Sequence, residues 1–220
     1  MNEAVIVSTA RTPIGKAYKG AFNNTHGATL AGHAIKEAVK ISKIDPSTVE
    51  DCLMGCGMPE GATGHNIARQ AAIRAGLPIS TAGATINRFC SSVLQTITMA
   101  AQIIMTNELD IIVAGGLESI SLVQNEHQNN FMAQESWINQ NKPELYYTMI
   151  QTAEVVSKRY NISREEQDAY GLQSQQRMAN AQKLGYLDKE IFSLESTKLI
   201  LSLIHISEPT RLRRIADSVV

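Results

Sequence analysis

The feature that most constrains the fold is a strand–helix–strand pattern between residues 82 and 116. Residues 82–86 predict a short strand entered through a turn. After a polar turn, residues 111–114 predict a second strand, and the intervening apolar side chains recur on one helical face as far as Met105: Val93, Leu94, Ile97, Ala100, Ala101 and Ile104. Two strands joined by a helix within about 30 residues form a βαβ unit, which places both strands in one sheet with a right-handed crossover.

Cys90 lies where the first of these strands ends and the helix begins. At such a junction a sulfur is close to unpaired backbone N–H groups and to the positive end of the helix dipole, which favours a thiolate. Because a thiolate attacks carbonyl carbon, this position predicts a nucleophile. The alternative is that Cys90 is a small buried hydrophobic residue, as free cysteines often are.

Composition excludes several classes of function. The 220 residues are 44% hydrophobic, enough for one substantial core, and the net charge is −1 with five scattered histidines. This balance gives no basic surface for nucleic acid. Because no apolar run reaches membrane-spanning length and residues 1–4 lack the features of a secretory signal, we expect a cytoplasmic protein without a membrane segment.

The three cysteines do not form the even set that a disulfide framework requires. Cys52 and Cys56 lie four residues apart on a predicted strand, so their side chains share a face. As metal ligands they would need further histidine or cysteine partners, and no nearby cluster supplies them. We therefore expect no metal site and two buried thiols.

The rest of the first 120 residues continues the α/β pattern. Residues 4–8 form a nearly continuous apolar run that predicts a strand buried on both faces of a sheet. Thr29 is expected to cap a helix as far as Ile41, and a helix is expected over residues 67–75, ending at Gly76. Residues 1–120 thus predict one α/β layer domain with a mixed sheet covered by helices.

The character of the sequence changes from Val123 onward, where an irregular stretch is followed by segments that predict helices. Residues 125–142 are rich in Asn and Gln without a clear period, which indicates an irregular surface segment. A helix is expected over residues 149–160. Ser163 and Glu166 form a capping box that opens a long polar helix ending near Gly185.

Four ordered segments resemble the signatures of the thiolase family, the acyl-CoA C-acyltransferases. The segment Asn87-Arg88-Phe89-Cys90-Ser91-Ser92, followed by Leu94-Gln95, resembles the family's nucleophile signature. The other three are residues 5–15, residues 114–121 and residues 162–175. Together they cover residues 2–195, which is more specific than any single motif, and the resemblance is closest to thiolases of longer 3-ketoacyl-CoA substrates.

This resemblance implies a fold and a chemistry. Residues 1–120 would be the family's N-terminal α/β domain, and residues 121–196 its loop domain over the active site. Cys90 would carry the acyl group as a thioester, with its own backbone N–H as an oxyanion donor, and Met149 would line the pantetheine channel. Coenzyme A would be a co-substrate, without a cofactor or metal, and the intact parent would be a homodimer or homotetramer active in fatty-acid β-oxidation.

The sequence departs from the family pattern in three ways. The family's Gly-His-Pro and Cys-x-Gly-Gly-Gly motifs, which hold the base and a second cysteine, do not occur in these 220 residues. We therefore expect an inactive fragment that lacks the C-terminal half of the fold. Val93 stands where the family normally has glycine, and residues 197–220 do not resemble the family, which is consistent with a gene-model artefact.

Two alternatives stay open from the sequence. One is a decarboxylating condensing enzyme of the related ketoacyl-synthase group, which shares the fold and a cysteine nucleophile. The other is a non-catalytic fragment that only pairs with thiolase subunits, which the absence of a Gly-His-Pro motif favours.

Overall fold

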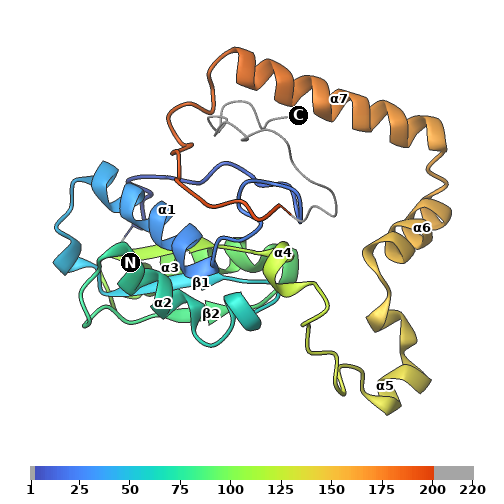
Figure 1. The fold of residues 1–220 in the computed structure, drawn as a ribbon, viewed down its shortest axis with the longest axis horizontal. Coiled ribbons are helices and arrows are strands. Elements are labelled where there is room, and N and C mark those ends of the chain that lie inside the picture. The colour runs from blue at the N-terminus through green and yellow to red at the C-terminus, as the bar shows by residue number, and fades with distance from the viewer. Residues whose placement is uncertain (1–2, 201–220) are drawn as a thin grey trace. The chain divides into compact units, whose positions relative to one another are not determined.

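The computed structural model describes residues 3–200, and a small parallel sheet is the basis of the fold of the first 120 or so of them (Figure 1). Its strands are β1 (Asp51–Gly55), β2 (Ala84–Ile86) and β3 (Ile112–Gly116), in the order β2-β1-β3. Both outer strands run parallel to β1, and Leu53 pairs with Ala84 on one side and with Ala114 on the other. The prediction that both strands of the βαβ unit share a sheet is confirmed. The expected mixed sheet is wrong, because every pairing among the described strands is parallel.

Two helices cover one face of this sheet: α1 (Gly27–Ser42) and α2 (Ile67–Ala75). Because side chains alternate along a strand, Cys52 and Met54 of β1 point to the same face, and both pack with these helices in the main apolar core. The buried members of that core are Ala31, Ile35, Val39, Val49, Cys52, Met54, Ala68, Ala71, Ala72 and Leu77. The predicted helix over residues 67–75 and its Gly76 cap are confirmed.

The helix α3 (Ser92–Met105) covers the other face, and two glycines let it approach closely. Gly55 and Gly116 are register partners in β1 and β3. A Cβ atom at Gly55 would lie 2.6 Å from the Ser92 carbonyl carbon, and one at Gly116 would overlap Cγ2 of Val93. The start of α3 therefore rests on strand backbone, where any larger residue would push it away.

Helix caps account for several element ends. Asp45 accepts a hydrogen bond from the backbone N–H of Ser47 at 2.9 Å, before a 3-10 turn over Pro46–Thr48. This bond lowers the pKa of the Asp45 carboxyl. The predicted Thr29 cap is wrong: Nδ1 of His26 accepts from the N–H of Ala28 at 3.1 Å, and Thr29 already lies in the first turn of α1.

The expected N-terminal strand over residues 4–8 is also wrong. This segment has no ladder partner among the described residues, and Val5, Ile6 and Val7 are each about two-thirds exposed or more. Its hydroxyl group at Ser8 donates to the carbonyl of Ala38 at 2.8 Å, which holds the segment beside α1. An apolar run becomes a strand only where a sheet edge pairs with it, and the described sheet does not offer one here.

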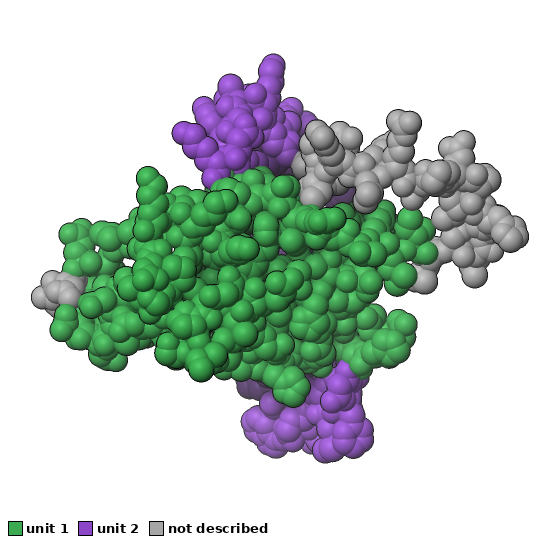
Figure 2. All heavy atoms as spheres, turned by 60° about the vertical axis from the view of Figure 1, so that its left-hand side comes forward, with its two compact units in different colours: residues 1–128, 190–220 green, residues 129–189 purple. Residues whose placement is uncertain are grey.

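The chain divides into two compact units, which are described separately (Figure 2). Unit 1 comprises residues 1–128 and 190–220, and it also holds the short helix α4 (Ile120–Val123). Unit 2 comprises residues 129–189, a range that lies inside the helical domain expected over residues 121–196. The expected domain limits themselves stay a prediction.

Unit 2 consists of helices joined by short turns. The predicted helices are confirmed as α6 (Met149–Tyr160) and α7 (Arg164–Lys183), with Gly185 in a left-handed conformation after the Leu184 cap of α7. The segment expected to be irregular has no helix or strand over residues 125–135, as predicted, but it ends in the short helix α5 (Ser136–Asn141). This helix begins where the Glu135 carboxylate accepts from the N–H groups of Trp137 and Ile138. A 3-10 turn, Pro143–Tyr146, follows it.

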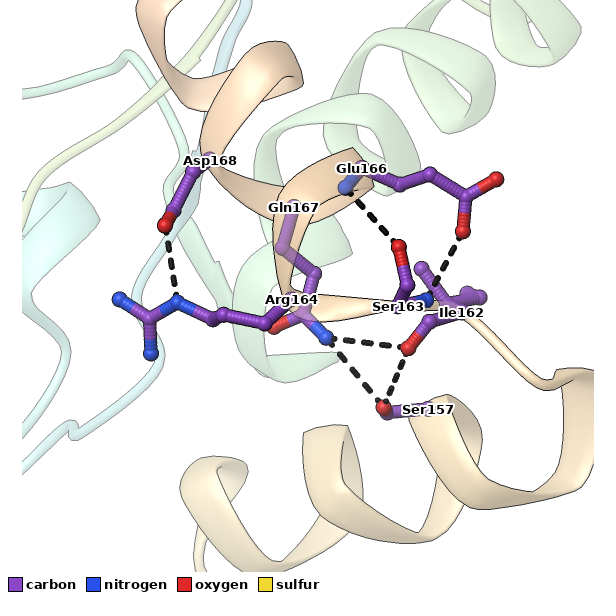
Figure 3. A network of polar contacts seen from close by, with 7 residues as sticks. All are labelled: Ser157, Ile162, Ser163, Arg164, Glu166, Gln167 and Asp168. Atoms are coloured by element: carbon purple, nitrogen blue, oxygen red, sulfur yellow. Dashed lines mark hydrogen bonds and ion pairs between the residues drawn. The ribbon is translucent and has the colours of Figure 1, made fainter.

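The turn between α6 and α7 is held by polar contacts (Figure 3). Ser163 Oγ accepts from the N–H of Glu166 at 3.2 Å, and the Glu166 carboxylate accepts from the N–H of Ser163 at 2.8 Å, which is the predicted capping box. The Gln167 amide donates to Ser157 and to the carbonyl of Ile162, both at 3.3 Å. Local polar contacts thus define this corner.

Within residues 3–200, no helix combines the length and the apolar character that crossing a membrane requires.

Candidate active site around Cys90

Cys90 lies in a single 3-10 turn, Phe89–Ser91, between the end of β2 and the start of α3. This is the strand-to-helix junction that the sequence predicts. The cysteine is a free thiol and is exposed, so the alternative of a buried hydrophobic residue does not hold in this structure. Its sulfur is accessible to a reactant, as a nucleophile requires.

The residue before the cysteine adopts an uncommon backbone conformation. Phe89 has φ of 47°, in the left-handed region that residues other than glycine rarely enter, and its side chain is 72% exposed. Such a conformation costs on the order of 1–3 kcal/mol and persists only where neighbouring groups hold it. One of these is the side chain of Asn87, whose Oδ1 accepts from the Phe89 N–H at 2.9 Å.

Ser92 fixes the peptide group that joins Phe89 to Cys90. Its side chain is buried, accepts from the N–H of Arg88 at 2.8 Å, and donates to the carbonyl oxygen of Phe89 at 2.6 Å. In a trans peptide the C=O and the following N–H point in opposite directions. Holding the Phe89 carbonyl therefore also fixes the direction of the Cys90 N–H, the group expected to act as an oxyanion donor.

A second contact lies under the same turn, at the ends of β1 and β3. The Glu118 carboxylate accepts from the N–H of Gly57 at 2.8 Å and lies 3.7 Å from the sulfur of Cys56. A Cβ atom at Gly57 would be 3.7 Å from Cα of Phe89 and 3.8 Å from its carbonyl carbon. Gly57 thus lies beside the backbone that leads into Cys90, at a distance that a single Cβ atom would fill.

Side chains at the start of α2 hold β2 and the loop that leads into it. The Asn66 side chain accepts from the hydroxyl of Thr85 at 3.1 Å and donates to the carbonyl of Gly83 at 2.7 Å. The guanidinium of Arg69 donates to the carbonyls of Ile79 and Thr81. These bonds fix the strand from which the Cys90 turn departs.

Comparison with known proteins assigns the chain to a family. The family description "Thiolase, N-terminal domain" matches residues 4–217. The chain belongs to the thiolase family. The matched range includes most of residues 197–220, the tail that we expected not to resemble the family.

Individual thiolases agree with this assignment. The chain is 40% identical over 197 residues to a 3-ketoacyl-CoA thiolase of Bacillus subtilis, covering 90% of this chain and 50% of that protein. It is 37% identical over 196 residues to a 3-ketoacyl-CoA thiolase of Aliivibrio fischeri, with coverage of 89% and 50%. A Shewanella oneidensis 3-ketoacyl-CoA thiolase is 34% identical over 214 residues, with coverage of 97% and 54%. The chain therefore spans about half the length of the curated thiolases it matches.

The other two cysteines of this thiolase chain differ sharply from Cys90. Both Cys52 and Cys56 are buried and free. Burial, with a smaller contribution from Asp51, raises the pKa of the Cys52 thiol to about 12. Burial, together with the Glu118 carboxylate, also raises the pKa of Cys56. Both thiols therefore stay protonated near neutral pH.

Among residues 3–200, no group of three potential metal-ligating side chains comes together.

Met149 lies in unit 2, as the first residue of α6 after the Thr148 cap, and its side chain is 70% exposed. Cys90 lies in unit 1, and the two units are described separately, so no distance between Met149 and Cys90 is defined. The assignment of Met149 to a pantetheine channel stays a prediction.

The sequence did not identify two residues that shape the Cys90 turn. Ser92 was read only as part of the nucleophile signature, although a serine beside a helix start is a common hydrogen-bonding residue. Glu118 was part of a matched thiolase segment but had no assigned role, because its partner Gly57 lies 61 residues away in the sequence. Val93 was identified, and its side chain packs over Gly116 while remaining 42% exposed.

Proposed function

We propose that this thiolase chain carries the nucleophile half of an acyl transfer between 3-ketoacyl-CoA and CoA. The observation that carries the proposal is the exposed Cys90 thiol in a rigidly held turn between β2 and α3. The names of the three relatives given above, each a 3-ketoacyl-CoA thiolase, support the substrate class. The intact parent would cleave 3-ketoacyl-CoA, or condense acetyl-CoA in the reverse direction, within fatty-acid β-oxidation in the cytoplasm.

The cleavage proceeds in two transfers. The Cys90 sulfur attacks the C3 carbonyl, a sulfur–carbon bond forms, and the C2–C3 bond breaks. The electron pair left on C2 takes a proton, which releases acetyl-CoA. The thiol of a second CoA then attacks the thioester, so that the acyl group leaves on CoA and Cys90 regains a proton. CoA acts here as a substrate, and the reaction as written needs no metal or other cofactor.

The chain's own contribution is the nucleophile and one oxyanion donor. During each attack, negative charge develops on the carbonyl oxygen, and a fixed N–H group stabilises it. Ser92 holds the peptide group so that the Cys90 N–H keeps one direction. Removing one such donor typically lowers turnover by about 100-fold to 1,000-fold. In unit 2, Met149 would contact the pantetheine portion of CoA.

These 220 residues would not complete the cycle alone, because neither a Gly-His-Pro nor a Cys-x-Gly-Gly-Gly motif occurs among them. We expect no thiolysis of acetoacetyl-CoA above background by the purified chain, and the same result for Cys90→Ala. Robust turnover would show that another residue of this chain serves as the base. In the intact parent, the complete site would form in a homodimer or homotetramer.

The nucleophile role can be tested without turnover. The native chain is incubated with octanoyl-CoA, and transfer of the acyl group from the CoA sulfur to a protein sulfur is followed by intact mass and peptide mapping. We expect octanoyl on Cys90, none on Cys52 or Cys56, and none in Cys90→Ala. A brief treatment with limiting iodoacetamide should label Cys90 first, because the other two thiols are buried and protonated. Acylation no faster than in the urea-unfolded chain, or preferential labelling of Cys52 or Cys56, would overturn the assignment.

A second candidate is a non-catalytic fragment that pairs with thiolase subunits. The exposed apolar residues of α3 favour it: Leu94 is 66% exposed, and Val93, Ile97 and Met105 are about 40% exposed. Co-purification with a full-length subunit, without octanoyl transfer to Cys90, would support this candidate over the first.

A further inference from the structure

We propose that Glu118 is a positioning residue for the Cys90 turn and acts through the backbone of Gly57. The inference rests on the proposed nucleophile role of Cys90. Glu118 follows β3, Gly57 follows β1, and the Cys90 turn follows β2, so the three segments meet at the carboxyl ends of three parallel strands.

The first step of the argument is that the Gly57 segment has a defined position. Cys56 is anchored to β2 by its N–H, which donates to the carbonyl of Ile86 at 3.0 Å. The next N–H, that of Gly57, donates to the Glu118 carboxylate at 2.8 Å. A hydrogen bond to a charged acceptor is stronger than one between neutral groups. Glu118 therefore ties the end of β1 to the end of β3 just beyond the last ladder pair, Gly55 with Gly116.

The second step is that Gly57 lies against the strained residue. A Cβ atom added to Gly57 would be in ordinary van der Waals contact with Cα of Phe89, at 3.7 Å, so the Gly57 backbone lies beside the turn. Asn87 and Ser92 hold Phe89 through its own N–H and C=O groups. Gly57, placed by Glu118, limits movement of the backbone between them. If this support is lost, Phe89 can relax and the Cys90 N–H changes direction.

The third step separates this role from general stability. Glu50 makes an equivalent contact at the opposite end of the same sheet: its carboxylate accepts from the N–H groups of Asp110 at 2.6 Å and Ile111 at 3.1 Å. Both glutamates therefore hold a backbone segment at an end of β3, but only Glu118 is beside the Cys90 turn. Glu50→Ala is thus a matched control for the loss of a carboxylate-to-backbone bond.

The test compares octanoyl transfer to Cys90 in the native chain, Glu118→Ala, Glu118→Gln and Glu50→Ala. For Glu118→Ala we expect the first-order acylation rate to fall by about tenfold to a hundredfold, as small errors in geometry do elsewhere, with the half-saturating octanoyl-CoA concentration unchanged. Glutamine keeps an acceptor for the Gly57 N–H, so Glu118→Gln should restore most of the rate. Glu50→Ala should lower the urea midpoint but leave the rate unchanged.

Alkylation by iodoacetamide is the second readout. It needs the Cys90 sulfur but no oxyanion donor, so Glu118→Ala should alter it far less than it alters octanoyl transfer. Equal losses in both reactions, or the same acylation rate in Glu118→Ala as in the native chain, would overturn the inference. If no octanoyl transfer occurs even in the native chain, the proposed nucleophile role fails instead.

Gly57→Ala keeps the inference testable if Glu118→Ala does not fold. Its Cβ atom would lie 3.0 Å from the Glu118 carboxylate, the flexible end of a side chain that can move aside. We expect this variant to fold and to show the same selective loss of acyl transfer over alkylation. An acylation rate equal to that of the native chain would count against the support through Gly57.

Discussion

Helices of both units begin at side-chain caps, but only α1 and α2 of unit 1 also bury an apolar face. In unit 1, α1 and α2 bury apolar side chains against β1, and residues such as Ile67 and Cys52 are completely buried. In unit 2, residues 129–189 are all described and none of them is buried. Its helices begin at side-chain caps, at Glu135, Thr148 and Ser163. Burial stabilises the sheet that positions Cys90, whereas local hydrogen bonds define the helices that carry Met149.

The largest expected difference between the units is in amide hydrogen exchange. Amides of β1 and α2 should exchange only when unit 1 unfolds as a whole, whereas those of α7 should exchange through local opening. For a typical domain stability this separates the two groups by at least about a thousandfold in rate. Hydrogen-exchange mass spectrometry of the native chain measures both. Slow exchange throughout α7, at the level of β1, would mean that unit 2 has a stabilising contact beyond its caps.

Truncation of one apolar side chain in each unit should also give unequal effects. Ile67→Ala leaves a cavity in the α2 core and should lower the free energy of unfolding by about 2–5 kcal/mol. Leu172 lies on α7 and is 60% exposed, so Leu172→Ala should stay within about 0.5 kcal/mol. Urea unfolding followed by circular dichroism compares the two. Similar losses would contradict the contrast between a buried core and a solvated helix.

An effect smaller than that of Ile67→Ala is expected at the start of α7. Ser163→Ala removes the acceptor for the Glu166 N–H and should cost about 0.5–2 kcal/mol of helix stability. Exchange should rise in the first turn of α7 and stay unchanged in β1. Ser174→Ala, inside the same helix, serves as the control and should not raise exchange at all. An equal response to both substitutions would show that the capping box does not determine where α7 begins.

Local signals in the sequence predicted the fold better than non-local ones. The Gly76 end of α2 and the Ser163 capping box depend on neighbouring residues, and each is found as predicted. The apolar segment over residues 4–8 needed a distant strand partner and does not form a strand. The strand prediction for residues 4–8 failed because composition alone does not say whether an edge of the sheet is free to pair with the segment.

The same difference between local and non-local signals holds for the Cys90 site. The position of Cys90 between a strand and a helix could be predicted from adjacent residues. The positive φ of Phe89 could not, because phenylalanine gives no sign of a left-handed conformation. The Gly57–Glu118 contact joins residues 61 positions apart, and it appears only when β1 and β3 are side by side.

The contact of Val93 with Gly55 and Gly116 also limits which substitutions can arise at these positions during evolution. A Cβ atom at Gly116 would meet the carbonyl oxygen of Gly55 at 2.7 Å as well as the Val93 side chain. Shrinking residue 93 would therefore remove only one of the two obstacles, and Gly116 would remain fixed by backbone. At this contact, the residue on α3 can therefore be substituted, whereas the glycine on β3 cannot. The valine at position 93 is a change of the permitted kind.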